Sequence, residues 1–209
     1  MTDLSYWRNY YAAHSRPTEP SLFAVYCMQR YLKPFMDILE LGCGNGRDSV
    51  YFASQRLRVT AVDQCQEELD YLSAAYPDIR FQRADFTNLI NMSPFDAVYS
   101  RFTLHTISRE EETRVFDWAY RHLRQNGYFL IEARGQKNEL YRKGTPVAGQ
   151  PDAFIFEGHF RRFIDLPQTQ RKLEHYGFHI LSAEEKPGFA PRQNENQIFC
   201  RLIAQKTRG

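Results

Sequence analysis

Acidic residues that follow short apolar segments are the first candidates for chemistry. Glu40 directly precedes three alternating glycines in the stretch 40–46, Asp63 ends a second apolar segment, and Asp85 follows a third. Because glycine has no Cβ, such a loop lets the backbone approach a ligand closely, whereas the acid in front of it repels phosphate groups. One such aspartate alone is often only a helix cap or a turn residue. Three acids in equivalent places predict a binding site for a ligand that carries positive charge.

Alternating strand and helix patterns position these acids. Amphipathic spacing predicts helices at residues 21–32, 47–53, 67–75, 110–123 and 168–176, with Ser21 capping the first. Short apolar or β-branched segments predict strands at residues 36–41, 57–63, 79–83, 95–100, 128–133, 178–182 and 198–204. This alternation predicts an α/β domain with a parallel, doubly wound sheet and right-handed crossovers. The carboxyl ends of its strands should face the ligand crevice.

Composition limits the location and the partners. The 209 residues are enough for one domain, and the formal net charge of +2 argues against a polyanionic partner such as DNA. Four scattered cysteines show no disulfide or metal-site spacing, so we expect a reduced protein without a metal ion. The first residues lack an apolar leader and no apolar run is long enough to span a bilayer. We therefore expect a cytoplasmic protein with neither nucleic acid nor membrane as its partner.

The stretch Glu40-Leu41-Gly42-Cys43-Gly44-Asn45-Gly46, with Asp63 and Asp85 at the next strand ends, resembles the class I S-adenosylmethionine-dependent methyltransferases. The resemblance covers nearly the whole chain. A P-loop would need a Gly-Lys-Ser/Thr sequence, which is missing, and Glu40 disfavours a nicotinamide-dependent oxidoreductase. The resemblance implies a Rossmann-like, doubly wound, seven-stranded sheet, mostly parallel with the last strand antiparallel, and helices on both faces. It also implies S-adenosyl-L-methionine as cofactor and S-adenosyl-L-homocysteine as product.

The same resemblance assigns the residues that hold the donor. Glu40 would attract its ammonium and sulfonium charges, Asp63 would accept hydrogen bonds from the ribose hydroxyls, and Asp85 would read the adenine edge. Phe86 would flank the adenine ring, and Ser100 and Arg101 occupy the family position nearest the transferred methyl group. The expected donor-binding residues are Glu40, Gly42, Cys43, Gly44, Asp63, Gln64, Ala84, Asp85, Phe86, Ser100 and Tyr11.

Arginines near predicted strand ends suggest an anionic acceptor, because guanidinium forks suit carboxylates and phosphates. We expect Arg101, His105 and Arg134 to be the catalytic residues, with His105 as a possible general base. Residues 154–161 read as one strand, with Phe154, Phe156 and Phe160 on one side and Glu157, His159 and Arg161 on the other. The alternative is that these arginines are solvated or pair with Glu132, Glu139 and Glu157, and that His105 only packs. The expected acceptor-binding residues are Tyr6, His14, Arg101, Arg134, Tyr141, His159, Arg161 and Arg162.

Two segments should complete the acceptor side of a single domain that spans residues 1–209. An N-terminal segment at about 1–33 resembles the lid of small-molecule members of the family, although it could equally be a helix packed on the sheet. A Gly- and Pro-containing insertion at about 135–166 is long for a connection inside a compact domain. Loops of that length are usually functional.

The sequence favours a small-molecule acceptor. No Asn/Asp-Pro-Pro-Tyr/Phe element follows the fourth predicted strand and no Pro-Cys pair is present, which disfavours base modification. Residues 41–49 and 157–163 resemble small bacterial enzymes of two sorts, those of capsule and lipopolysaccharide loci and the tellurite-resistance and thiopurine-like group, and the arginines favour the first. We therefore expect methyl transfer to a phosphate- or carboxylate-bearing acceptor, most simply O-methylation in surface-polysaccharide or secondary metabolism, by a monomer or homodimer. The alternatives are a thiol or chalcogen methyltransferase of the tellurite-resistance type and a non-catalytic S-adenosylmethionine-binding or scaffold protein.

Overall fold

A computed structural model of the chain describes residues 17–90, 92–191 and 195–207. Seven strands form one sheet in which β10 runs antiparallel to both of its neighbours, while the other pairings are parallel. This confirms the expected Rossmann-like sheet. In spatial order the strands are β3 (Arg80–Arg83), β2 (Arg58–Asp63), β1 (Asp37–Leu41), β4 (Phe95–Arg101), β5 (Leu123–Ala133), β10 (Phe199–Lys206) and β9 (Phe178–Lys186).

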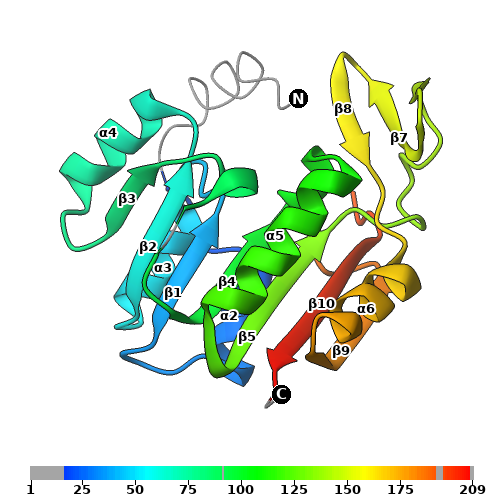
Figure 1. Ribbon diagram of the computed structural model, residues 1–209. Coiled ribbons are helices and arrows are strands. Elements are labelled where there is room, and N and C mark those ends of the chain that lie inside the picture. Colours follow the sequence, from blue (N-terminus) through cyan, green and yellow to red (C-terminus); the bar gives the residue numbers. More distant parts are fainter. Residues whose placement is uncertain (1–16, 91, 192–194, 208–209) are drawn as a thin grey trace.

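Helices cover both faces of the sheet (Figure 1). On one face, α2 (Leu22–Arg30), α3 (Arg47–Ser54) and α4 (Gln66–Ala75) bury an apolar cluster that includes Phe23, Phe52 and Tyr99. On the other face, α5 (Arg109–His122) and α6 (Leu166–His175) pack on a cluster that includes Phe116 and Phe129. None of the helices in the described ranges is both long and apolar enough to cross a membrane.

Local sequence explains where the helices begin. Ser21 caps α2, because its Oγ accepts a hydrogen bond from the Ala24 amide at 3.0 Å, as the sequence predicts. Ser108 and Glu111 form a capping box at the start of α5. Two short 3-10 helices, η1 (Phe86–Asn88) and η2 (Leu104–Thr106), follow β3 and β4, so the chain turns tightly at the carboxyl edge of the sheet.

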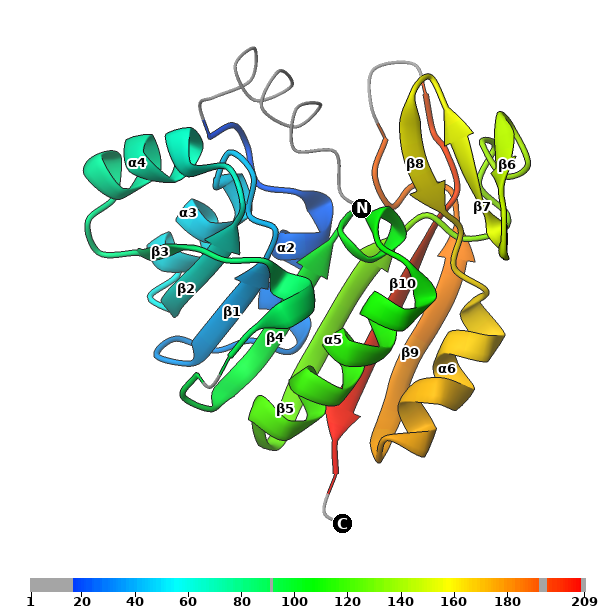
Figure 2. The ribbon, with the colours of Figure 1, turned by 45° about the horizontal axis from the view of Figure 1, so that its top comes forward.

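The insertion forms a small antiparallel sheet beyond the carboxyl ends of the parallel strands (Figure 2). Its strands are β6 (Thr145–Val147), β7 (Gln150–Phe156) and β8 (His159–Arg162), so the single strand expected over residues 154–161 is wrong. Glu157 and Gly158 have φ values of 54° and 71° and form a hairpin turn instead. Because Phe156 pairs with His159 and Phe154 with Arg161, these side chains share one side of the hairpin, contrary to the alternation expected for one strand.

Arg162 fastens this insertion to the main domain. Its side chain is 3% exposed, and its Nε and Nη2 donate to the carbonyls of Ile107 and Leu104 at 2.9 and 3.1 Å. Nη2 also contacts Glu112 of α5 at 2.5 Å, and Nη1 lies 3.6 Å from Asp152 of β7. A guanidinium thus satisfies two carbonyls and two buried carboxylates at the junction, which fixes the hairpin relative to η2.

Replacing Arg162 by Ala should therefore lower the free energy of unfolding by about 3 to 5 kcal/mol, because buried charges are left without their partner. Urea denaturation measures this change. Arg121→Ala is the matched control, since Arg121 pairs with Asp117 on the exposed side of α5 and its loss should cost about 0.5 kcal/mol or less. Equal effects of the two substitutions would contradict the anchoring role of Arg162.

Candidate active site

The loop between β1 and α3 depends on its glycines. Gly42, Gly44 and Gly46 have φ values of 70°, 53° and 72°, in the left-handed region that favours glycine. A Cβ on Gly42 would lie 2.5 Å from the Cγ2 of Thr103, which follows β4. The Gly42 and Cys43 amides both donate to the Val62 carbonyl of β2, at 2.8 and 3.0 Å. The loop is thus held against two strand ends at once, with its backbone at the carboxyl edge of the sheet.

Glu40, at the end of β1, is a buried carboxylate. It is 5% exposed and accepts a hydrogen bond from the Oγ of Ser49. Burial and the negative charge of Asp48 raise the pKa of Glu40 well above its usual range, and the contributions of Ser49 and Arg101 only partly oppose this. No ion pair of Glu40 occurs within the described residues. A cation that entered this site would restore the ionised carboxylate and would be bound by it.

Asp48 joins three elements beside Glu40. Its carboxylate accepts hydrogen bonds from the Ser21 amide and hydroxyl, both at 2.7 Å, and from the Tyr99 hydroxyl at 2.8 Å. Ser21 begins α2, Asp48 lies in the first turn of α3, and Tyr99 is in β4. This buried network holds the start of α2 against the glycine loop and places a second negative charge next to that loop.

Asp63, at the end of β2, holds the glycine loop. Its Oδ2 accepts a hydrogen bond from the Gly44 amide at 2.9 Å, and its Oδ1 accepts one from the Cys65 amide at 3.0 Å. The turn-forming role that the sequence left open is therefore present. Since each carboxylate oxygen has two lone pairs, Asp63 retains the capacity to accept hydrogen bonds from a pair of hydroxyls. Gln64, the residue between Asp63 and Cys65 in the chain, is half-buried.

The segment after β3 lies against the same loop. Asp85 caps η1, with its Oδ1 accepting hydrogen bonds from the Thr87 amide and hydroxyl at 2.9 and 2.8 Å. The Ala84 amide donates to the Asp63 carbonyl at 2.9 Å, which ties this segment to the end of β2. Phe86 is 7% exposed, and its ring edge lies 3.8 Å from the position of a Cβ on Gly42. These expected donor residues therefore gather around one loop.

Glu68 of α4 is a further carboxylate near the loop, and the sequence reading did not identify it. It is 7% exposed, and its Oε1 has no hydrogen-bond partner within the described residues. Burial and the nearby charge of Asp63 raise the pKa of Glu68 to about 7. Its spacing was the signal in the sequence, because residues four apart share one face of a helix and Glu68 lies four residues before Leu72. Leu72 faces the loop, since a Cβ on Gly46 would lie 2.8 Å from its side chain. An acid on the loop-facing stripe of a helix is unusual and could have been noticed.

Arg101 is committed to an internal partner. Its Nε donates to Glu132 of β5 at 2.9 Å, and the other oxygen of Glu132 accepts a hydrogen bond from Arg201 of β10 at 2.6 Å. Glu132 is fully buried, so the alternative in which Arg101 pairs with Glu132 describes its contacts correctly. Ser100 is also fully buried, with its Oγ 2.6 Å from the Oγ1 of Thr103. Both residues stabilise the strand end beside the loop.

His105 of η2 is a buried, neutral imidazole. Its pKa lies well below the usual range because of burial, and then because of the positive charges of Arg134, His159 and Arg161, among others. The Arg134 amide donates to its Nδ1 at 3.3 Å, which places the ring proton on Nε2. Such a histidine donates a hydrogen bond through Nε2 and is poorly suited to accept a proton. This geometry argues against the general-base role and in favour of an orienting one.

Arg134 directly follows β5 and is held by neutral groups. Its Nη1 donates to the side-chain oxygens of Asn138 and Gln197 at 3.0 and 2.7 Å, and its guanidinium carbon lies 5.1 Å from the centre of the Phe199 ring. These contacts fix the direction of the guanidinium. Arg134 is half-buried, so its position suits an anion in the crevice.

The insertion contributes residues of two kinds. His159 is buried and Arg161 is half-buried, with its Nη1 donating to the Phe156 carbonyl at 2.6 Å, and both raise the positive potential at His105. Tyr141 packs against two phenylalanine rings, with centroids 5.9 and 5.4 Å away. Arg162 is buried among protein partners, and we do not retain it as an acceptor-binding residue. The insertion thus places His159 and Arg161 near His105 and is held to the main domain by Arg162.

Three expected residues, Tyr6, Tyr11 and His14, lie outside the described residues. The described part of the expected lid contains α2, which packs on the sheet through Phe23, Ala24 and Cys27. Within the described ranges no three His, Cys, Asp or Glu side chains are grouped so that they could hold a metal ion. The described site therefore consists of the acids around the glycine loop and the cationic group around His105.

Comparison with known proteins agrees with this geometry. Residues 38–127 match the family described as methyltransferase domain. The cypemycin N-terminal methyltransferase of a Streptomyces species is 32% identical over 99 residues, which are 46% of this chain and 40% of that relative.

Solved structures share the fold at low sequence identity. A methyltransferase of Methanosarcina mazei has a TM-score of 0.75 at 20% identity, covering 87% of this chain and 97% of that one. The 1,6-didemethyltoxoflavin-N1-methyltransferase of Burkholderia thailandensis, solved with S-adenosylhomocysteine, has a TM-score of 0.74 at 20% identity, covering 98% and 85%. Residues 38–127, which hold the glycine loop, thus match a methyltransferase domain, and the strand order of the sheet agrees with the fold of these solved structures.

Proposed function

We propose that this chain transfers the methyl group of S-adenosylmethionine to a small acceptor that bears a phosphate or a carboxylate. The observation that carries the proposal is the separation of charge across the site. Acids surround the glycine loop, whereas the groups that shift the pKa of His105 are all cationic or basic. One end of the crevice therefore suits a cationic donor and the other an anionic acceptor.

Within the described residues, the cations near the donor end pair with acids other than Glu40. Arg101 and Arg201 share Glu132, and Asp48 is held mainly by hydroxyl and amide donors, with Arg47 at 3.7 Å. Glu40 has no comparable partner within the described part of the chain. The ammonium and sulfonium groups of S-adenosylmethionine would supply that charge, and its sulfonium supplies an activated methyl carbon. Asp63 and Glu68 would accept hydrogen bonds from the ribose and the loop side of the donor.

The acceptor end needs little acid-base chemistry. A phosphate or carboxylate oxygen is already ionised near neutral pH, so it attacks the methyl carbon as the carbon–sulfur bond breaks, and the electron pair of that bond leaves with sulfur. No proton has to move. Arg134 and Arg161 would hold the anion, and the Nε2–H of neutral His105 would orient it. This assignment replaces the base role that the sequence suggested for His105.

The charge of the site also bears on the metabolic setting of the protein. We infer O-methylation of a small metabolite in surface-polysaccharide or secondary metabolism, in the cytoplasm, by a monomer or homodimer that does not act on nucleic acid or membranes. The cationic acceptor end supports an anionic metabolite, and the four cysteines, all unpaired and buried, fit a reducing compartment. Two of the similar proteins are named an N-terminal methyltransferase and an N1-methyltransferase, so the substrate screen below includes amines.

The first test is donor binding. We expect S-adenosylmethionine and S-adenosylhomocysteine to bind with micromolar affinity, about 7 to 9 kcal/mol, and NAD not to bind. Asp63→Ala should weaken binding by about 1.5 to 3 kcal/mol, because Asp63 loses its ligand contacts and also releases the loop. Calorimetry measures both, and Asp70→Ala, on the exposed side of α4, is the control. NAD binding in place of S-adenosylhomocysteine would rule out the proposed donor.

Donor binding should also depend on pH through Glu40. Its pKa is raised in the free protein and should fall when a cation binds, so S-adenosylmethionine affinity should decrease as pH falls from about 8 to about 5. Calorimetry in two buffers with different ionisation enthalpies should detect proton release on binding. Glu40→Gln should weaken binding and flatten this dependence, whereas the exposed Glu174→Gln should leave both unchanged. An unaltered pH profile in Glu40→Gln would assign the dependence to another group.

The third test concerns the acceptor. Metabolite extracts incubated with methyl-labelled donor identify a substrate, whose Michaelis constant should rise about tenfold or more in Arg134→Ala, with donor affinity nearly intact. Arg134→Lys should rescue only partly, because an ammonium group lacks the fork, and the exposed Arg171→Ala is the control. Turnover of neutral thiols, phenols or amines without turnover of anionic compounds would refute the acceptor class. Donor binding with no methylated product would favour the non-catalytic alternative.

A further inference from the structure

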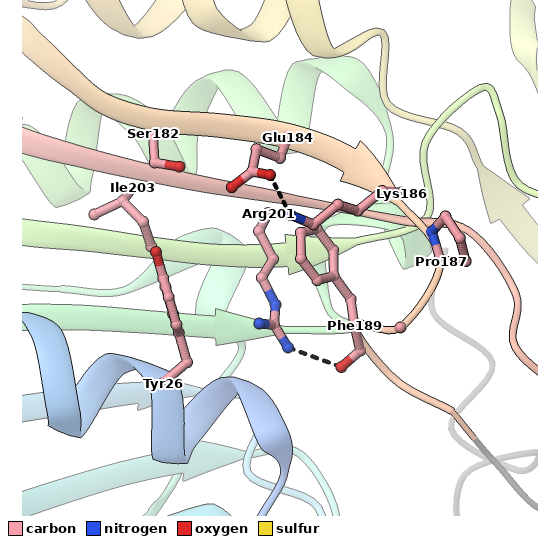
Figure 3. A pocket seen from close by; sticks show the side chains of 9 residues that line it. Tyr26, Ser182, Glu184, Lys186, Pro187, Phe189, Arg201 and Ile203 are labelled. Carbon is pink, nitrogen blue, oxygen red and sulfur yellow. Dashed lines mark hydrogen bonds and ion pairs between the residues drawn. The ribbon is translucent and has the colours of Figure 1, made fainter.

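A second cavity lies on the α2 face of the sheet, at β9 and β10 (Figure 3). It has a volume of about 310 Å³. None of its lining residues belongs to the donor loop or to the group around His105. The residues that matter for its chemistry are Tyr26 of α2, Ser182 of β9, Pro187 and Phe189 of the following loop, and Arg201 and Ile203 of β10.

Arg201 forms the charged part of the cavity wall. Its Nε donates to Glu132 at 2.6 Å and its Nη2 donates to the Phe189 carbonyl at 2.8 Å. The guanidinium carbon lies 4.2 Å from the centre of the Phe189 ring and 5.4 Å from that of Tyr26. Within the described residues its Nη1 has no hydrogen-bond partner. Because Arg201 is only 8% exposed and lines the cavity, a ligand there would meet a largely desolvated guanidinium.

Arg201 shares its buried counter-ion with Arg101. Glu132 is its ion-pair partner within the described residues, and Arg101 shares the same carboxylate. At the cavity rim, Lys186 pairs with Glu184, so these two charges offset each other. The feature of this wall that suits an anion is therefore Nη1 of Arg201, which faces the cavity side of a guanidinium already held by Glu132 and the Phe189 carbonyl.

We propose that this cavity binds a small, flat organic molecule with one carboxylate group. The carboxylate would accept a hydrogen bond from Nη1 of Arg201, and Ser182 offers a hydroxyl donor. The walls of Tyr26, Pro187 and Ile203 are apolar and suit a ring. The volume is at the lower end of the range for ligand sites, so the ligand has about ten non-hydrogen atoms. Because Glu132 is shared, an anion on Arg201 weakens its hold on Glu132 and strengthens that of Arg101.

Benzoate is the probe, and benzamide is its neutral counterpart of the same shape. Titration of the isotopically labelled protein by NMR should give saturable benzoate binding with a dissociation constant of about 1 mM or tighter. Benzamide should bind at least about tenfold more weakly, since it cannot form the charge-assisted hydrogen bond. Acetate should also bind more weakly, since it lacks the ring. The shifted resonances should belong to residues that line the cavity.

Variants locate the site. Ser182→Phe fills the cavity and should weaken benzoate binding about tenfold or more, whereas Leu181→Phe, at an adjacent exposed residue that does not line it, should change binding less than about twofold. Arg201→Lys should weaken benzoate but not benzamide, and Ser182→Phe still decides if this variant does not fold. Binding of S-adenosylhomocysteine should persist in Ser182→Phe. Absent or non-saturable benzoate binding, equal binding of benzamide, or an unaffected Ser182→Phe protein would overturn the proposal.

Discussion

A buried carboxylate on β5, an inner strand, constrains the carboxyl edge of this sheet. Glu132 is fully buried, so it must be compensated, and Arg101 and Arg201 do so from the two neighbouring strands with which it is in register. Removing either guanidinium would leave part of a buried charge unpaired. The three residues fix the relative height of β4, β5 and β10, and hence the edge on which the crevice is built.

Beyond these three residues, the electrostatics of the site depend on Glu40 and on the cations around His105. Glu40 is buried beside Asp48 without an ion pair in the described part of the chain, and its pKa is raised accordingly. Around His105 the neighbouring charges are positive, and burial together with these charges lowers the pKa of His105. Each end thus stores an electrostatic cost that a ligand of the complementary charge removes. The proposed cationic donor and anionic acceptor would each find the opposite charge at one of those two ends.

The sequence predicted the parts of this arrangement that depend on neighbouring residues. The glycine loop, the acids at the strand ends and the Ser21 cap need only local patterns. Partners that meet across the fold were harder to predict. The pairing of Arg101 with Glu132 was one of two alternatives, because it depends on the register of β4 and β5. The burial of Arg162 between α5 and η2 depends on how the insertion packs, which no local pattern gives. The reading of residues 154–161 as one strand failed because the turn at Glu157 and Gly158 reverses the chain. An alternation pattern that is continued through the turn assigns the residues after it to the wrong side of the strand.

The acids near the glycine loop and the cations near His105 lie in different parts of the chain. The donor loop is built from β1, β2, α3 and α4, which lie within the matched methyltransferase domain. The cations around His105 come from the end of β5 and from the insertion, which lie after that match. Arg162 joins the two parts, because it binds carbonyls on either side of His105 while it belongs to β8. An insertion of different sequence could therefore change the acceptor while the donor loop stayed the same, provided that it kept an anchor of this kind on η2.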